Sequence, residues 1–202
     1  KYSVHVFIKK FDTGKFAEQN KVSIQVAARE LRYEWFEELR KQSDSLQLTK
    51  DNQAHSKGKL NRTSHVAHPT YLLTAHHAND NMETLLMNFF KGTGVAGLRA
   101  ILPRQGKVIR PLLFAKKEEI IKFAAENNLQ FVEDSSNLSD KYTRNYFRNQ
   151  LIPSLQKVFP GVEENLINNI ERFGEIDELY RQNIGQHTKK LIEKKGNEIH
   201  IP

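Results

Sequence analysis

The sequence predicts an α/β layer structure with a mainly parallel sheet, and three observations indicate it. Residues 2–8 alternate between apolar and polar side chains, as a strand does. Residues 71–75 form a short apolar run of the buried-strand type, followed at once by a polar loop and an amphipathic helix. Several other segments repeat apolar residues at spacings of three and four, which is typical of helices that cover a sheet.

The first helix is predicted over residues 23–41, after a polar connection at residues 11–20 in which Gly14 acts as a breaker. Ser23 can cap this helix, and an apolar stripe runs along it from Ile24 to Leu39. Residues 42–69 are rich in Ser, Asn, Gln, Lys and His and hold few aliphatic side chains. Such a segment cannot bury enough apolar area to offset its ordering entropy, so we expect a mobile insertion.

The second half of the chain alternates again between helices and short connections. The helix after residue 76 carries Leu85, Leu86, Phe89 and Phe90, and a short helical turn is expected at residues 97–101. We then expect a helix at residues 116–127, a strand at 129–132, a loop at 133–140, a helix at 142–158 and a last helix that can continue to residue 195. The predicted domains are residues 1–158 and a helical extension at 159–202.

Composition restricts the class of partner. The chain of 202 residues has 31 Lys and Arg against 24 Asp and Glu, and its net charge of +7 favours nucleic acid, or a membrane surface second. No apolar run is long enough to span a bilayer. We therefore expect a cytoplasmic protein with no membrane partner. The absence of cysteine excludes disulfides and thiolate chemistry. Because the first residue is Lys1, we expect the chain to begin inside a longer protein.

The polar segment at residues 76–84 is the first candidate for chemistry. Ligands of open parallel sheets bind beyond the carboxyl ends of the strands, where this segment would lie. Asp80 and Glu83 are three residues apart and could hold a hydrated Mg²⁺ that bridges to substrate phosphates. The same spacing fits a capping box in which Asp80 caps the helix and Glu83 reaches back, and both roles can hold at once.

His76 and His77 precede these carboxylates, and each has a packing and a functional interpretation. Consecutive strand side chains point to opposite faces, so we expect one histidine to face the ligand crevice and the other the core. No third ligand stands at a familiar zinc spacing.

Arginines supply the candidate contacts to phosphate. Arg144 and Arg148 are one helical turn apart with Asn145 between them, and their guanidinium groups could clamp successive phosphates or simply form a solvated helix face. Arg29 and Arg32 lie off the apolar stripe of the first helix, where solvation explains them as well as a site would.

Six blocks of the sequence carry a resemblance to a known family: residues 23–33, 76–84, 90–94, 110–113, 133–137 and 143–148. In order and spacing they resemble the tRNA(Ile)-lysidine synthetase family of PP-loop ATP pyrophosphatases, whose pattern H-H-x-D-D-x-x-E-T is similar to residues 76–84. Asn79 stands where the family has its first Asp, which shifts the expected role to Asp80. The family's S-G-G-x-D-S loop, whose backbone N–H groups cradle the ATP phosphates, does not occur in these residues, so we expect the chain alone to be inactive.

The resemblance implies a partial Rossmann-like sheet of the adenine nucleotide alpha hydrolase type and a ligase that forms a C–N bond. ATP would adenylate the C2 oxygen of the wobble cytidine in tRNA(Ile), and the ε-amine of L-lysine would displace AMP. The implied cofactors are ATP and Mg²⁺, and a homodimer is left open. The implied site residues are His76, His77, Asp80 and Glu83 for catalysis, with Asp80 and Glu83 also for metal; Thr84, Gly92, Gly94, Arg29 and Arg32 for the cofactor; and Arg110, Arg144, Asn145 and Arg148 for RNA.

Three other functions remain open at this point. Another PP-loop pyrophosphatase, such as a thiolating enzyme or a synthetase of purine nucleotides, would share the fold, but thiolation commonly needs cysteine and the chain has none. A non-catalytic RNA-binding module would explain the charge of +7 and predicts salt-dependent binding without turnover. A structural helical adaptor fits less well, because the chain is dense in motifs.

Overall fold

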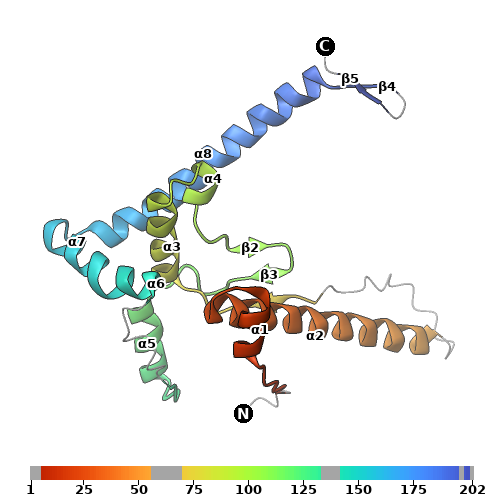
Figure 1. The fold of residues 1–202 in the computed structure, drawn as a ribbon, viewed down its shortest axis with the longest axis horizontal. Coiled ribbons are helices and arrows are strands. Elements are labelled where there is room, and N and C mark those ends of the chain that lie inside the picture. Colours follow the sequence, from red (N-terminus) through yellow and green to blue (C-terminus); the bar gives the residue numbers. More distant parts are fainter. Residues whose placement is uncertain (1–5, 56–69, 133–141, 196–197, 201–202) are drawn as a thin grey trace. The chain divides into compact units, whose positions relative to one another are not determined.

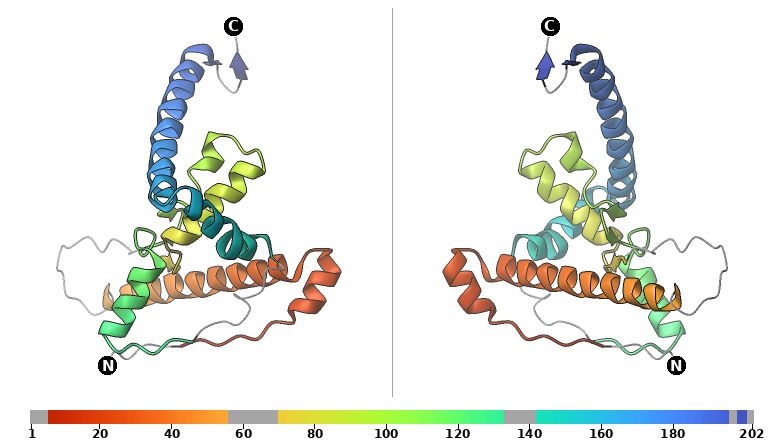
Figure 2. Two further views of the ribbon diagram at one scale, coloured as in Figure 1. Left: turned by 90° about the vertical axis from the view of Figure 1, so that its left-hand side faces the viewer. Right: turned by 90° about the vertical axis from the view of Figure 1, so that its right-hand side faces the viewer.

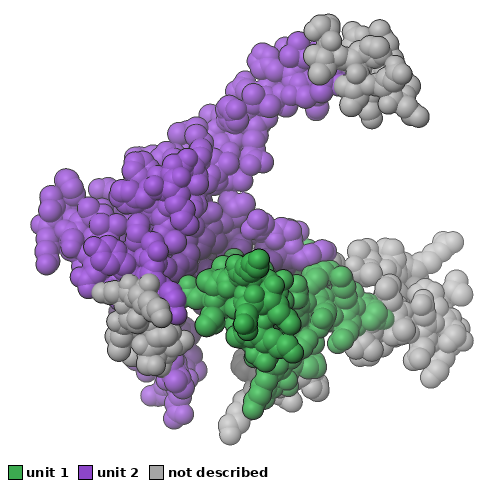
Figure 3. All heavy atoms as spheres, viewed as in Figure 1, with its two compact units in different colours: residues 1–72 green, residues 73–202 purple. Residues whose placement is uncertain are grey.

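The computed structural model describes residues 6–55, 70–132, 142–195 and 198–200. The chain divides into two compact units, Lys1–Leu72 and Leu73–Pro202, which Figure 3 shows in two colours. No helix in the described part of the chain is both long enough and apolar enough to cross a membrane.

The first unit consists of two helices, α1 (Thr13–Asn20) and α2 (Ile24–His55) (Figure 1). Asp12 starts α1 by accepting the Lys15 N–H at 3.1 Å, and Lys21 ends it in the left-handed conformation. The prediction of a polar connection at residues 11–20 is therefore wrong for residues 13–20, which form α1. Helix α1 is stabilised by packing against α2. Just before α1, the ring of Phe11 meets that of Trp35 edge to face at 5.9 Å.

Ser23 caps α2 as predicted, because its hydroxyl accepts the Val26 N–H at 3.3 Å. The apolar stripe is displaced at its start, since Ala27 is fully buried and Ile24 is exposed. The predicted end near residue 41 is wrong, because α2 continues to His55. Arg40 supports that continuation by pairing with Glu37 and Asp44, one turn away on either side.

Two other predictions concern segments that are only partly described. The strand expected at residues 2–8 is not formed at residues 6–8, and residues 1–5 lie outside the described residues. The mobile insertion expected at residues 42–69 is helical as far as residue 55, and residues 56–69 again lie outside.

The described residues include a small sheet of order β1-β3-β2, in which β1 is Leu72–Leu73, β2 is Arg104–Gln105 and β3 is Val108–Ile109. Strands β2 and β3 pair antiparallel around Gly106, whose φ of 59° suits a tight turn. The described strands are too short to form the extended parallel sheet expected. The strand expected at residues 129–132 is also wrong, because Val132 is 97% exposed and this segment has no regular structure.

Helix α3 (Ala78–Phe90) is the centre of the second unit and buries Met82, Leu85 and Leu86. It is contacted by α4 (Val95–Leu98), α6 (Thr143–Tyr146), the π-helix η2 (Phe147–Leu151) and α8 (Val162–Leu191). The two views of Figure 2 agree on the position of α8 beside α3 and α4. The fold therefore gives α3 two occupied sides, one facing α6 and η2 and the other facing α8.

The remaining helices follow the sequence closely. Helix α5 (Lys117–Glu126) lies within the range predicted, and α6, η2 and α7 (Ile152–Val158) together fill residues 143–158. The last helix is α8, after which β4 (Glu193–Lys195) and β5 (Glu198–His200) pair antiparallel. The domain boundary predicted at residue 158 stays a prediction, and the loop predicted at 133–140 lies outside the described residues.

Candidate functional site

The candidate site forms at the first turn of α3, where the sequence analysis placed it. His77 is the N-cap residue, and its backbone N–H donates to the Asp80 carboxylate at 3.1 Å. Capping is therefore real, but Asp80 reaches back to His77, and Glu83 has no part in it. The carboxylate of Asp80 also lies favourably at the positive end of the helix dipole.

Glu83 lies one turn further along α3 and is fully buried. Arg148 of η2 grips it in a two-pronged contact, Nε to Oε1 at 2.6 Å and Nη2 to Oε2 at 3.0 Å. The same Nη2 donates to Oδ1 of Asp80 at 3.1 Å. One guanidinium thus joins both carboxylates, although Arg148 and Glu83 are 65 residues apart in the sequence.

Burial and pairing act in opposite directions on these groups. Burial raises the pKa of the Glu83 carboxyl, and the hydrogen bonds and charge of Arg148 offset part of that rise. Desolvation alone would lower the pKa of Arg148, but its bonds to Glu83 and the nearby Asp80 raise it overall. A buried carboxyl with a raised pKa is typical of functional sites, although structural ion pairs produce the same effect.

Arg144 joins the cluster more loosely. Its Nη2 donates to the Thr84 hydroxyl at 3.0 Å, and its Nε lies 3.8 Å from Glu83. Arg144 and Arg148 therefore share a face, as expected, but that face is turned to protein carboxylates. Only Arg144, with 39% of its side chain exposed, keeps a substantial surface for phosphate.

The two histidines have different environments. Nδ1 of His76 lies 2.9 Å from the Thr74 hydroxyl. His77 has Nε2 at 3.5 Å from Asp80, and its Nδ1 is buried without a hydrogen-bond partner. His77 is therefore the histidine that contributes to the carboxylate cluster.

The Asp80 and Glu83 carboxylates do not fit the Mg²⁺ site expected of them. Both oxygens of Glu83 and both of Asp80 already accept hydrogen bonds, from Arg148 and from the His77 backbone. No group of three metal-ligating side chains occurs among the described residues. A hard cation needs several free oxygen ligands, and in this arrangement all four carboxylate oxygens accept hydrogen bonds.

Other predicted site residues lie away from this cluster. Arg110 is buried, 8% exposed, and donates from Nη1 to the Leu102 carbonyl at 2.8 Å, and its role in binding RNA stays a prediction. Gly92 and Gly94 stand at the end of α3 and the start of α4. Arg29 belongs to α2 in the first unit, where its guanidinium lies over the Tyr33 ring at 5.0 Å.

The roles proposed for Arg32 and Asn145 stay predictions. Arg32 is on α2, in the first unit, and Asn145 is in α6, next to Arg144 in the sequence.

Sequence reasoning missed several polar anchors. Asn79 accepts the Lys117 N–H at 2.9 Å and so satisfies the start of α5. Asn81 is buried and accepts the Ile101 N–H at 2.7 Å. Asp177 of α8 is 3% exposed and pairs with Arg99 at 2.9 Å. The sequence signal for Asp177 is its position in the helical stripe that contains Leu166, Ile170 and Phe173.

Known proteins match the chain along nearly all of its length. A family model described as a PP-loop domain matches residues 59–155. A protein of Bacteroides thetaiotaomicron named tRNA(Ile)-lysidine synthase is 35% identical over 98% of the chain, and one of Thermosipho africanus with the same name is 36% identical over 92%. The chain spans only 41% and 38% of these relatives.

Proposed function

Because the chain belongs to the tRNA(Ile)-lysidine synthase family, of whose members it spans about two fifths, we propose that the full-length protein attaches L-lysine to the wobble cytidine of tRNA(Ile). The reaction consumes ATP, which the PP-loop match supports. ATP first adenylates the C2 oxygen of the base and releases pyrophosphate, and the ε-amine of lysine then forms the new C–N bond and releases AMP. The fold proposed for the full-length protein is Rossmann-like, and its location is cytoplasmic.

The observation that carries this proposal is the cluster of Asp80, Glu83 and Arg148 in the segment that resembles the family pattern. Two carboxylates that hold one guanidinium offer the same charge and hydrogen-bond acceptors to a lysine ε-ammonium. We propose that the lysine ammonium binds Asp80 and Glu83 in exchange for Arg148. The released guanidinium, with Arg144, then faces the phosphates of the nucleotide or the tRNA.

Proton transfer is the second task of the cluster. The amine must lose a proton before it attacks, and the His77 ring lies beside Asp80, with its Nε2 3.5 Å from that carboxylate. We propose His77 as the proton acceptor, with Asp80 orienting it. Mg²⁺ in this proposal enters with ATP on its phosphates, because the Asp80 and Glu83 carboxylates bind the lysine ammonium.

Lysine incorporation into a tRNA(Ile) transcript by the full-length protein, with ATP and Mg²⁺, tests the proposal. Asp80→Asn should abolish incorporation and leave tRNA affinity nearly unchanged, because its role is local. Asn79→Asp is the matched control and should be mild, since a carboxylate also accepts the Lys117 N–H at the start of α5. A wild-type protein that binds tRNA but never incorporates lysine would show an RNA-binding module instead.

If Asp80→Asn lowers stability by about 1 kcal/mol and leaves turnover unchanged, Asp80 acts only as a helix cap.

A further inference from the structure

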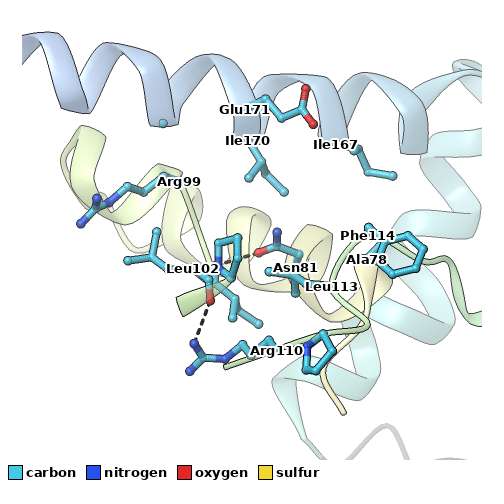
Figure 4. Close-up of a pocket in the computed structure, with 14 residues that line it drawn as sticks. Ala78, Asn81, Arg99, Leu102, Arg110, Leu113, Phe114, Ile167, Ile170 and Glu171 are labelled. Carbon is cyan, nitrogen blue, oxygen red and sulfur yellow. Dashed lines mark hydrogen bonds between the residues drawn. The ribbon is translucent and has the colours of Figure 1, made fainter. Parts of the chain in front are cut away.

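A pocket of about 520 Å³ lies in the second unit, on the side of α3 that faces α8 (Figure 4). Its size is in the usual range for small-ligand sites. Ala78 and Asn81 of α3 line it, so it is separate from the face that carries Asp80 and Glu83. The walls are mostly apolar: Ile101, Leu102, Leu113, Ile167 and Ile170.

Arg110 lines this pocket and has a side-chain nitrogen without a hydrogen-bond partner. It is 8% exposed, and the only hydrogen bond of its side chain among the described residues goes to the Leu102 carbonyl, which Figure 4 shows as a dashed line. Its Nε is buried without a hydrogen-bond partner, and none of the ion pairs in the part of the chain that the structure describes involves Arg110. A buried guanidinium costs free energy unless it is paired, so an outside acceptor that enters this pocket would be stabilised there.

Gly174 of α8 keeps the opposite wall open. A Cβ added to this residue would meet no atom within 4 Å, so packing inside the chain does not require glycine. Glycine within a helix is destabilising by roughly 0.5–1 kcal/mol relative to alanine. Gly174 therefore leaves this wall of the pocket without a side chain.

The rim of the pocket carries an aromatic ring and cations. Phe114 lines the pocket and is 84% exposed. The β2–β3 hairpin connects the pocket residues Pro103 and Arg110, and it bears the exposed Arg104 and Lys107. Proteins hold unstacked bases of single-stranded RNA with this combination of aromatic stacking, a hydrogen-bond donor for the base edge and cations for the backbone.

We propose that this pocket receives one unstacked nucleobase of the tRNA, whose carbonyl oxygen accepts a hydrogen bond from Arg110. Phe114 stacks on the base, and the β2–β3 hairpin follows the neighbouring phosphates. A free aliphatic acid would also suit Arg110 and the apolar walls, but it would gain nothing from the exposed ring or the basic hairpin. The identity of the RNA as tRNA rests on the function proposed above.

The test uses the full-length protein and anticodon stem-loops that carry pyrrolo-cytidine, a fluorescent base with a carbonyl oxygen, at one loop position at a time. Gly174→Phe fills the pocket from α8. Gly185→Phe is the matched control, because Gly185 is on the same helix, has the same open surroundings and does not line the pocket. Gly174→Ala controls for the loss of glycine alone.

One loop position should change its fluorescence on binding to the wild type, to Gly174→Ala and to Gly185→Phe, and not on binding to Gly174→Phe. Gly174→Phe should also weaken binding by about 5- to 150-fold, the range expected for one lost base stack. If Gly174→Phe lowers the melting temperature, Gly174→Leu replaces it, since leucine suits a helix and still fills the pocket.

Equal affinity and fluorescence for Gly174→Phe and Gly185→Phe would overturn the base pocket and leave the proposed function intact, because tRNA would still bind and be modified. Base insertion without lysine incorporation would overturn the proposed function alone. A thermal stabilisation by hexanoate that disappears in Arg110→Met, with no effect of Gly174→Phe on RNA, would assign the pocket to small organic acids.

Discussion

The contact between Arg148 and Glu83 can be measured as a double-mutant cycle. Arg148→Met leaves the buried Glu83 carboxylate without its two hydrogen bonds, and breaking a buried pair typically costs about 3–5 kcal/mol. The arginine side chain is 24% exposed, which places the expected loss near the lower limit, about 3 kcal/mol. Glu83→Gln keeps the shape but loses the charge, so we expect a loss of about 1.5–3 kcal/mol.

The double variant should be more stable than the sum of the single losses predicts, by about 1–3 kcal/mol, because either substitution already removes the contact. Urea unfolding followed by far-UV circular dichroism gives the four free energies of unfolding. Arg144→Met is the matched control and should cost under about 1 kcal/mol, since its Nε is 3.8 Å from Glu83 and its side chain is 39% exposed. Additive losses, or equal losses for the two arginines, would refute the two-pronged contact.

Three further predictions follow from the same geometry. Burial holds the pKa of Glu83 in the folded state above its ordinary 4.5, so the carboxyl contributes its full stability below pH 4.5 and loses it as the pH rises through the folded pKa. Glu83→Gln should therefore reduce the slope of the unfolding free energy against pH in this range. An unchanged slope would contradict this prediction. Arg144→Ala should reduce the slope of log affinity for tRNA against log salt by about 0.7–0.9 in filter-binding titrations, whereas an unaltered slope and affinity return Arg144 to a purely structural role. Asp177→Ala should lower stability by about 1–3 kcal/mol, because Asp177 is 3% exposed and pairs with Arg99. Arg181→Ala is its control and should cost under about 1 kcal/mol, because that side chain is 60% exposed. Equal melting temperatures for the two variants would contradict this prediction.

Periodicity and local capping chemistry were enough to locate most helices. The apolar stripe of α3, the range of α5 and the long final helix all follow from spacings of three and four, because a helix fixes which side chains share a face within one turn. The Ser23 cap is equally local. The motif at residues 76–84 and its family were recognisable for the same reason, since the motif is continuous in sequence.

Strands and exposed apolar runs were harder, because a strand needs a partner that the sequence does not name. The segment at 129–132 has strand-like residues but no paired neighbour in the described structure, and Val132 stays 97% exposed. The converse holds for α1, whose sequence is polar but whose Ala17 is buried beside α2.

By itself the sequence determined the family, the position of the carboxylates on the first turns of α3 and the shared face of Arg144 and Arg148. Only the tertiary structure decided what each charge contacts. Arg148 holds Glu83 across 65 residues, and Arg110 turns inward to a carbonyl at the edge of a pocket. Local sequence fixes a helical face to within one turn, but the partner of a charge depends on which distant face packs against it and on how much water that packing removes.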